Sequence, residues 1–301
     1  MNKTFKKKYI IDDGLIKFQI NNQKVKDVVD FYTKEPFPNY SEDDDKFSIN
    51  QKGELNDLSR TFKNLIGFNK DVLEVGSGTG QFSIYLSIGT NNRIYALDPT
   101  LASINLGKEF ALKNKIKNIR FVNADIFDDV FKDSFFDYIW TNGVLHHTEN
   151  PRLAFNIIQT YLKKDGYIIL GLYNKYGRAR TIIRKYLYKV FGKSIIMILD
   201  PILRNIKKNH NRQIMSWIQD QYEHPLESLH TLDEVLIWFD ENNIEFINSI
   251  PSCNLEKDNN NKLFDKTSRG TIFTRILSQI FMIFNHLGSD GGLFVVIGKK
   301  R

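Results

Sequence analysis

Cysteine is almost absent from the sequence: Cys253 is the single one among 301 residues. One thiol cannot form an intrachain disulfide framework or a cysteine-rich zinc site, so a reducing cytosol is the expected compartment. The first residues, MNKTFKKKYIIDDG, are basic but lack the long apolar run and the small-residue cleavage site of a signal peptide. We therefore predict a cytoplasmic protein.

Long uninterrupted apolar runs are also missing. The most apolar segment, 271–287 (TIFTRILSQIFMIFNHL), contains Arg275 and is short for a membrane span. Two interpretations stay open: an amphipathic helix buried against the domain or a dimer partner, or a helix that faces lipid or an acyl chain. No transmembrane span is predicted, peripheral membrane contact is allowed, and the oligomeric state is not predicted.

Acidic residues are in the minority, with a formal net charge of +7. This excess permits nucleic acid, anionic lipid or acidic substrates as partners without indicating any of them. Lysine, asparagine and isoleucine are abundant along the whole chain, so we discount the charge as a compositional bias. The hydrophobic content of 42% is sufficient for a sizeable core.

The segment 71–80, DVLEVGSGTG, is the most informative pattern present. A short apolar strand ends near Glu74, and Gly76, Gly78 and Gly80 follow at alternate positions before a helical segment. Glycine allows a tight turn and a close approach of the backbone to a ligand at the helix N-terminus. The spacing G-x-G-x-G differs from the G-x-G-x-x-G of dinucleotide loops and disfavours NAD.

Further acids follow later strands. Asp98 ends the strand-like run RIYALD, where a carboxylate can bond a ribose hydroxyl, and Asp125 ends the next run, where it can accept from an adenine amine. A purely structural role remains open for two of these residues: Asp125 can instead cap a turn, and Ser77 can be a small loop residue.

Strand and helix patterns alternate from residue 71 onward, which predicts a parallel sheet covered on both faces. One helix is expected in the N-terminal part near 24–32, one from Pro151 to a stop at Gly166, and one over 231–242. The predicted strands after the first are 93–98, 119–124, 136–141, 167–173, 244–250 and 293–298.

These motifs, in this order over Val72 to Asn174, resemble the class I S-adenosylmethionine-dependent methyltransferases. The resemblance implies S-adenosylmethionine as cofactor, with its methionine end at Glu74 and the loop and its ribose at Asp98. It further implies that Asp125 and the Ile126 N–H hold the adenine, and that Asn142 and Gly143 line the sulfonium side. The full cofactor set is Glu74, Gly76, Ser77, Gly78, Gly80, Asp98, Asp125, Ile126, Asn142 and Gly143.

The expected fold is α/β, a Rossmann-like doubly wound sheet, mostly parallel, with an antiparallel C-terminal hairpin and helical insertions. Segments such as EPFPNY, NGVLHHTENP and GLYNKYGRAR resemble an uncharacterised bacterial group of methyltransferases with an insertion after the fifth strand. The expected parts are an N-terminal extension (1–70), the cofactor-binding core (71–177), a helical insertion over the acceptor (178–230) and the end of the core (231–301) with a second insertion at 251–292.

Methyl transfer is an in-line displacement, so the protein mainly positions the acceptor and, where needed, removes a proton. His146 and His147 follow the fourth strand at the edge where the methyl group should project. A neutral imidazole there can act as a general base, or it can orient the loop or the acceptor. Adjacent histidines do not fit a zinc pattern, and no metal is expected.

The leading interpretation is transfer to a small-molecule acceptor, lipophilic or anionic. Arg178, beyond the fifth strand, could bind a carboxylate or phosphate. Tyr222 and His224 either line the acceptor pocket or attach the insertion to the core. Two alternatives remain, an RNA methyltransferase and a noncatalytic cofactor-binding subunit, although no RNA-binding module is evident and nucleic acid is less favoured. The expected acceptor residues are Tyr40, Asn174, Arg178, Tyr222 and His224.

Overall fold

The computed structural model describes residues 4–20, 23–34, 36–205, 211–256, 262–284 and 292–301. Within these ranges a nine-stranded sheet has the order β1-β2-β5-β4-β3-β6-β7-β9-β8. Strands β2 to β7 run parallel to one another, whereas β1 is antiparallel to β2, and β9 is antiparallel to both β7 and β8. The strands are β1 (Ile10–Asp12), β2 (Leu15–Lys17), β3 (Asp71–Val75), β4 (Arg93–Asp98), β5 (Ile119–Asn123), β6 (Phe136–Asn142), β7 (Leu162–Tyr173), β8 (Ile244–Ile250) and β9 (Leu293–Lys300).

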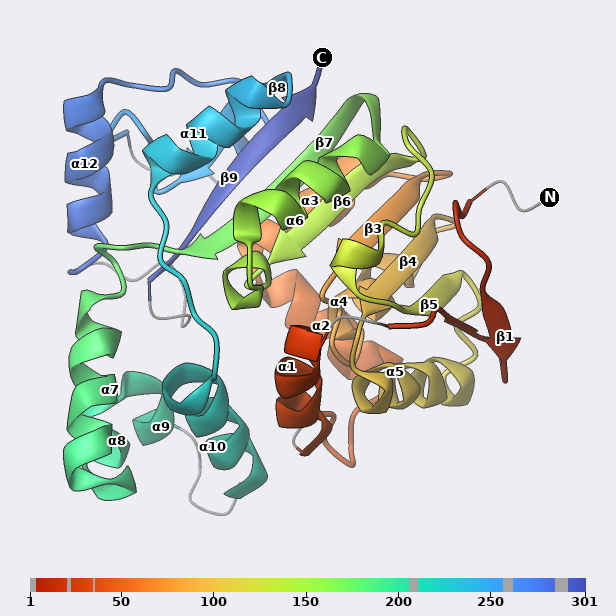
Figure 1. Cartoon of the computed structure of the whole chain (residues 1–301), viewed down its shortest axis with the longest axis horizontal. Coiled ribbons are helices and arrows are strands. Elements are labelled where there is room, and N and C mark those ends of the chain that lie inside the picture. Colours follow the sequence, from red (N-terminus) through yellow and green to blue (C-terminus); the bar gives the residue numbers. More distant parts are fainter. Residues whose placement is uncertain (1–3, 21–22, 35, 206–210, 257–261, 285–291) are drawn as a thin grey trace.

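Helices cover the sheet and extend beyond it (Figure 1). They are α1 (Gln23–Lys34), α2 (Lys46–Leu55), α3 (Asp57–Ile66), α4 (Gln81–Ser87), α5 (Leu101–Lys113), α6 (Pro151–Ile158), α7 (Ala179–Phe191), α8 (Lys193–Leu199), α9 (Pro201–Asn205), α10 (Asn211–Ile218), α11 (Leu232–Glu241) and α12 (Ile272–Phe281). A π-helical turn, Gln219–Glu223, continues α10. The predicted Rossmann-like fold with its antiparallel C-terminal hairpin is confirmed.

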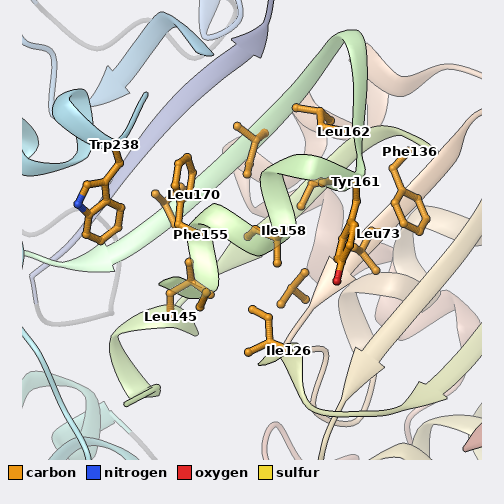
Figure 2. Packing of buried hydrophobic residues seen from close by; sticks show 14 of the residues in the cluster. Leu73, Ile126, Phe136, Leu145, Phe155, Ile158, Tyr161, Leu162, Leu170 and Trp238 are labelled. Atoms are coloured by element: carbon orange, nitrogen blue, oxygen red, sulfur yellow. The ribbon is translucent and has the colours of Figure 1, made fainter. Parts of the chain in front are cut away.

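The core lies on both faces of the sheet. All five residues of β3 are buried, as the central strand of a doubly covered sheet requires. Because side chains alternate along a strand, Leu73 packs into the cluster under α6 while Val72 packs into the cluster on the opposite face. Figure 2 shows Phe155 and Ile158 of α6 among the aliphatic side chains of the sheet, with Trp238 of α11 beside them.

The helix predicted from Pro151 to Gly166 needs correction. The helix from Pro151 ends at Ile158, and the expected stop at Gly166 instead lies within β7. The register explains this difference, because Leu162 pairs with Phe136 and Tyr167 with Tyr138, so the residues between them form an excursion of the strand. Gly166 is needed for packing there, since a Cβ would approach the Asp137 carbonyl oxygen to 2.8 Å.

The N-terminal segment contributes to the sheet, which the sequence did not predict. β1 and β2 form a hairpin, and β2 pairs in parallel with β5 through Ile16 and Val122. The segment also supplies α1, which the sequence did predict, and α2.

The helices α7 to α10 form a group beside the end of β7, apart from the sheet (Figure 1). Tyr32 of α1 donates a hydrogen bond to Asp220 of the π-helical turn at 3.0 Å, and Asn39 donates to Ser216 at 3.0 Å. The N-terminal segment therefore contacts this helical group directly over the carboxyl edge of the sheet.

Candidate functional site

The loop between β3 and α4 is built around positive backbone φ angles, +69° at Gly76 and +53° at Gly78. The Gly76 and Ser77 amides both donate to the Leu97 carbonyl at the end of β4, which fixes the loop to the sheet. A Cβ at Gly76 would lie 2.4 Å from Val144, and one at Gly78 would lie 2.2 Å from the Phe37 carbonyl oxygen. Only glycine satisfies both the backbone angle and this close packing.

Asp98, at the end of β4, closes the loop from the other side. One carboxylate oxygen accepts from the Gly78 N–H at 2.8 Å and the other from the Thr100 N–H at 2.8 Å. Burial raises the pKa of Asp98 above its ordinary value, while these two amides act in the opposite direction. A carboxylate has about four acceptor sites, so Asp98 can also accept from a ribose hydroxyl.

Glu74 lies near the end of β3, just before the glycine loop, and is buried. Its carboxyl accepts a hydrogen bond from the Ser83 hydroxyl of α4. Burial raises its pKa to about 8. A cationic group placed beside Glu74 would favour the carboxylate form, which suits the amino group of a methionine moiety.

Asp125 caps a turn, which was one of its two predicted roles, and it also lines the cavity. It forms a reciprocal capping box with Asp128 at the short turn Ile126–Asp128. Asp125 and Ile126 both lie on the cavity wall, so a capping role and contact with a ligand are compatible.

One cavity of about 400 Å³ joins these elements. Its wall includes Glu74, Gly76, Ser77, Gly78, Asp98, Asp125, Ile126, Asn142 and Gly143. Gly80 is absent from the wall; it precedes α4, where a Cβ would meet Phe121 at 2.9 Å. Within the described ranges, the buried Ser77 hydroxyl and the Asn142 side-chain oxygen have no hydrogen-bond partner, which fits a polar ligand in this cradle.

The same cavity continues toward α1 and the helical group α7–α10. There it is lined by residues that the sequence analysis missed: Val25, Val28, Tyr32, Trp217, Asp220, Gln221 and Leu226. The spacing of Trp217, Asp220 and Gln221, three and four residues apart, places them on one helix face and was the available signal. Their contact with α1 depends on the tertiary fold, and no local sequence pattern predicts it.

His147 is the one member of the histidine pair on the cavity wall. Its Nδ1 lies 2.8 Å from the Leu226 carbonyl, which can only accept, so Nδ1 carries the proton. Burial lowers the pKa of His147 to about 4, so the ring is neutral at pH 7 and its Nε2 keeps a lone pair. His147 can therefore accept a proton or a hydrogen bond.

His146 lies behind its neighbour and away from the cavity. It is fully buried, its ring stacks on Tyr173 with 3.8 Å between centroids, and its Nδ1 accepts from the Tyr173 N–H at 3.3 Å. Burial lowers the pKa of His146 well below its ordinary value. We expected His146 at the edge where the methyl group projects, but its side chain does not line the cavity.

Arg178 does not face the mouth of the cavity, contrary to expectation. The side chain is fully buried, forms an ion pair with Glu227 at 3.0 Å and donates to the Gln221 side chain at 2.6 Å. Its guanidinium also lies 3.6 Å from the centroid of the Tyr173 ring. Because these contacts join the end of β7 to residues 221–227, Arg178 attaches the insertion to the core and is not exposed to an anionic acceptor.

The other expected acceptor residues also lie off the cavity wall. Tyr40 donates to the Thr79 carbonyl and stacks on Phe110. Asn174 donates to Gln279 and accepts from the Tyr176 and Gly177 amides.

Tyr222 donates to Asp200, and His224 stacks on His147 with 3.7 Å between centroids. The His224 contact matches attachment of the insertion to the core, because His147 belongs to the core, whereas Tyr222 packs inside the insertion.

Two features are absent from the parts of the chain that the structure describes: a metal-binding group of side chains and a membrane-spanning helix. No group of three His, Cys, Asp or Glu side chains in those ranges is placed to hold a metal ion. None of the described helices is long and apolar enough to cross a membrane.

The sheet order, the glycine loop and the acids at the strand ends define the S-adenosylmethionine-dependent methyltransferase class. The sequence comparison agrees, since a methyltransferase-domain family matches residues 67–227. The chain belongs to this family and uses S-adenosylmethionine, for which the cradle around Glu74, Gly78 and Asp98 provides matching groups.

The relatives found by sequence are distant. An uncharacterised protein of Methanocaldococcus jannaschii is 29% identical over 46% of this chain and 62% of its own length. The tRNA U34 carboxymethyltransferase of Ruthia magnifica is 30% identical over 34% of the chain and 32% of that protein. The ubiquinone/menaquinone biosynthesis C-methyltransferase UbiE of Coxiella burnetii is 26% identical over 35% of the chain and 43% of that protein. The chain thus spans less than two thirds of each of these relatives.

Solved structures share the fold at low sequence identity. PKMT2 of Rickettsia typhi is 14% identical with a TM-score of 0.56, covering 81% of this chain and 53% of that protein. The cyclase SpnF is 12% identical with a TM-score of 0.51, covering 92% of this chain and 95% of that protein. Neither likeness extends beyond the fold.

Proposed function

We propose that this protein transfers a methyl group from S-adenosylmethionine to a small-molecule acceptor, and that residues 178–230 form the cover over that acceptor. The observation that carries the proposal is one continuous cavity, whose wall runs from Glu74 and Asp98 to Tyr32, Trp217 and Asp220. A ligand in the far part of this cavity would lie under α1 and the π-helical turn. A concave pocket of this size suits a compact acceptor better than a polymer.

The chemistry of the chamber favours an acceptor without negative charge. Val25, Val28 and Leu226 supply apolar wall, while Asp220, Gln221 and the Tyr173 hydroxyl supply polar groups. None of the described residues that line the cavity is lysine or arginine. An anionic acceptor, which the sequence allowed, would therefore meet carboxylates without a compensating cation.

The cofactor supplies an activated methyl group, and the chain's residues orient the acceptor beside it. His147 has a neutral ring with a lone pair on Nε2, so it can take the proton from the attacking atom or hold that atom by a hydrogen bond. Gln221 donates to both Tyr173 and Asp220 and thereby fixes the polar side of the chamber. We assign these three side chains, His147, Gln221 and Asp220, to the acceptor.

RNA is a second candidate, because one relative is named a tRNA U34 carboxymethyltransferase. The lack of basic residues on the described cavity wall disfavours a phosphate backbone there, since nucleic-acid binding depends on neutralising phosphates. A noncatalytic cofactor-binding subunit is the third candidate. The cytosol remains our proposed compartment, on the basis of the single cysteine.

One labelling experiment distinguishes the three candidate functions. The purified protein is incubated with methyl-labelled S-adenosylmethionine and cell extract, and the label is followed in an ultrafiltrate, in RNA and in protein. We expect label in the ultrafiltrate, insensitive to ribonuclease, and a loss of at least about tenfold for Asp220→Asn at unchanged cofactor affinity. Label in RNA would favour the second candidate. Cofactor binding without any labelled product would favour the third.

A further inference from the structure

The helical group α7–α9 exposes an apolar stripe that no described residue covers. Ile183, Tyr186 and Val190 of α7 are 61%, 68% and 55% exposed, and their spacing places them on one side of the helix. Phe191 and, on α8, Ile198 extend this surface, with exposures of 64% and 65%. Large apolar side chains gathered in this way mark an interaction surface.

The opposite side of α7 already has its partners. Tyr188 packs against Tyr222 with 5.8 Å between ring centroids and donates to Glu223, while Arg184 lies 3.8 Å from Asp200. Thr181 is buried on this inner side. The exposed stripe is therefore not the face that attaches α7 to the molecule, and its apolar character needs another explanation.

The charge beside the stripe is of one sign. Lys189, Lys193 and Arg204 are exposed on α7, α8 and α9. The one acid in residues 178–205, Asp200, is 2% exposed and bonded internally to Trp217 and Tyr222. Apolar side chains flanked by lysine and arginine are the pattern of a helix that lies in a membrane interface. Anionic headgroups complement such a surface, because each nearby cation adds attraction.

A second exposed apolar helix lies on the same side of the molecule. α12 is drawn above α7 at the left in Figure 1, and Met282, just after it, approaches Gly177 just before α7. Ile272, Phe273 and Phe284 of this region are 65%, 72% and 65% exposed. The segment that the sequence left open between a buried and a lipid-facing helix thus also exposes apolar side chains.

We propose that the outer surface of α7 and α8, continued by α12, docks on an anionic phospholipid bilayer. Docking by this surface leaves the cofactor loop free, because the loop lies at the sheet and the stripe lies on the far side of the helical group. The proposal is independent of the acceptor's identity. It requires only that the folded protein present the stripe.

The test is co-sedimentation of the full chain with vesicles of phosphatidylcholine alone and with vesicles containing phosphatidylglycerol. We expect binding to the anionic vesicles that weakens with added salt, and a loss of about tenfold or more for the double variant Ile183→Asp/Tyr186→Asp. Phe47→Asp/Leu112→Asp is the matched control, since Phe47 and Leu112 are 72% and 65% exposed elsewhere. The control should bind as the wild type does.

Three results would overturn the proposal. The wild type could fail to sediment with anionic vesicles, or the stripe variant and the control could bind equally. Light scattering provides the third: a wild-type dimer that the stripe variant converts to a monomer, without vesicle binding, would assign the stripe to a second copy of the chain. Cofactor-dependent thermal stabilisation of the stripe variant confirms in each case that it is folded.

Discussion

At the scale of single residues, three buried carboxylates line the cavity beside the β3–α4 loop. Glu74, Asp98 and Asp125 come from three strand ends, and each already has a protein partner: a hydroxyl, two amides, and a capped turn. These contacts fix the side chains before a ligand arrives, which reduces the ordering cost of binding. The sequence indicated all three acids, because acids at strand ends are visible without the fold.

Asp98→Ala should weaken S-adenosylmethionine binding by about 1.5–3 kcal/mol, the range for a hydrogen bond to a charged group. The variant also loses the contacts to the Gly78 and Thr100 amides, so some destabilisation of the free protein is expected. Calorimetric titration measures the affinity. Asp98→Asn, which keeps one acceptor oxygen, should lose less, and unchanged affinity in both variants would remove Asp98 from the site.

The pKa of Glu74, about 8 in the free protein, predicts a pH-dependent affinity. Near pH 7 the free carboxyl is mostly protonated, and a ligand ammonium beside it would lower its pKa in the complex, so binding releases a proton. Affinity should rise with pH toward 8 and level off above it. Titration calorimetry in buffers of different ionisation enthalpy counts the released protons. Glu74→Gln should abolish the release, and an unchanged release in that variant would assign it to another group.

At the scale of elements, the β3–α4 loop and the helical group show where sequence reasoning succeeds and fails. The loop is local, so its glycines and the following helix were predictable from spacing. The excursion of β7 at residues 163–166 was not, because Asp165 and Gly166 read as a helix stop and only the pairing with β6 makes them part of a strand. α2 had a local signal, the capping box of Asp45 and Ser48, which the sequence analysis missed.

Gly78→Val should abolish cofactor binding. A β-branched residue is strained at a φ of +53°, and its Cβ would overlap the Phe37 carbonyl oxygen. Thermal unfolding with and without S-adenosylmethionine measures the effect as loss of ligand-dependent stabilisation. Gly89→Val is the control, since Gly89 has a φ of +73° but open space around it. A Gly78→Val variant stabilised as strongly as the wild type would contradict the loop geometry.

Arg178→Ala should destabilise the fold by up to about 3–5 kcal/mol, because it removes a fully buried guanidinium from Glu227 and Gln221 and leaves Glu227 only Lys185, at 3.7 Å. The double variant Arg178→Met/Glu227→Gln, which removes both charges, should recover part of that loss. Arg152→Ala breaks an exposed pair with Glu241 and should cost at most about 1 kcal/mol. Denaturant unfolding provides these comparisons. Equal stability of Arg178→Ala and wild type would contradict the attachment role of Arg178 and favour a role in acceptor binding.

At the scale of the whole molecule, the cavity depends on contacts between segments far apart in the chain. Tyr32 and Asp220 are separated by 188 residues yet share a hydrogen bond on the cavity wall. No local pattern marks such a pair, which is why the expected acceptor residues lie off the cavity wall, whereas most of the expected cofactor residues lie on it. Arg178, expected at the acceptor, packs against Tyr173 and Glu227, and Tyr222 packs inside the helical group.

A crystal structure of the protein with S-adenosylhomocysteine tests the central claim most directly. We predict that the ligand fills the cavity beside the β3–α4 loop, with its ribose hydroxyls in hydrogen-bond contact with Asp98 and its amino group beside Glu74. Its sulfur should face the chamber lined by His147, Asp220 and Gln221. Ligand bound elsewhere, or with its sulfur turned away from that chamber, would contradict the account.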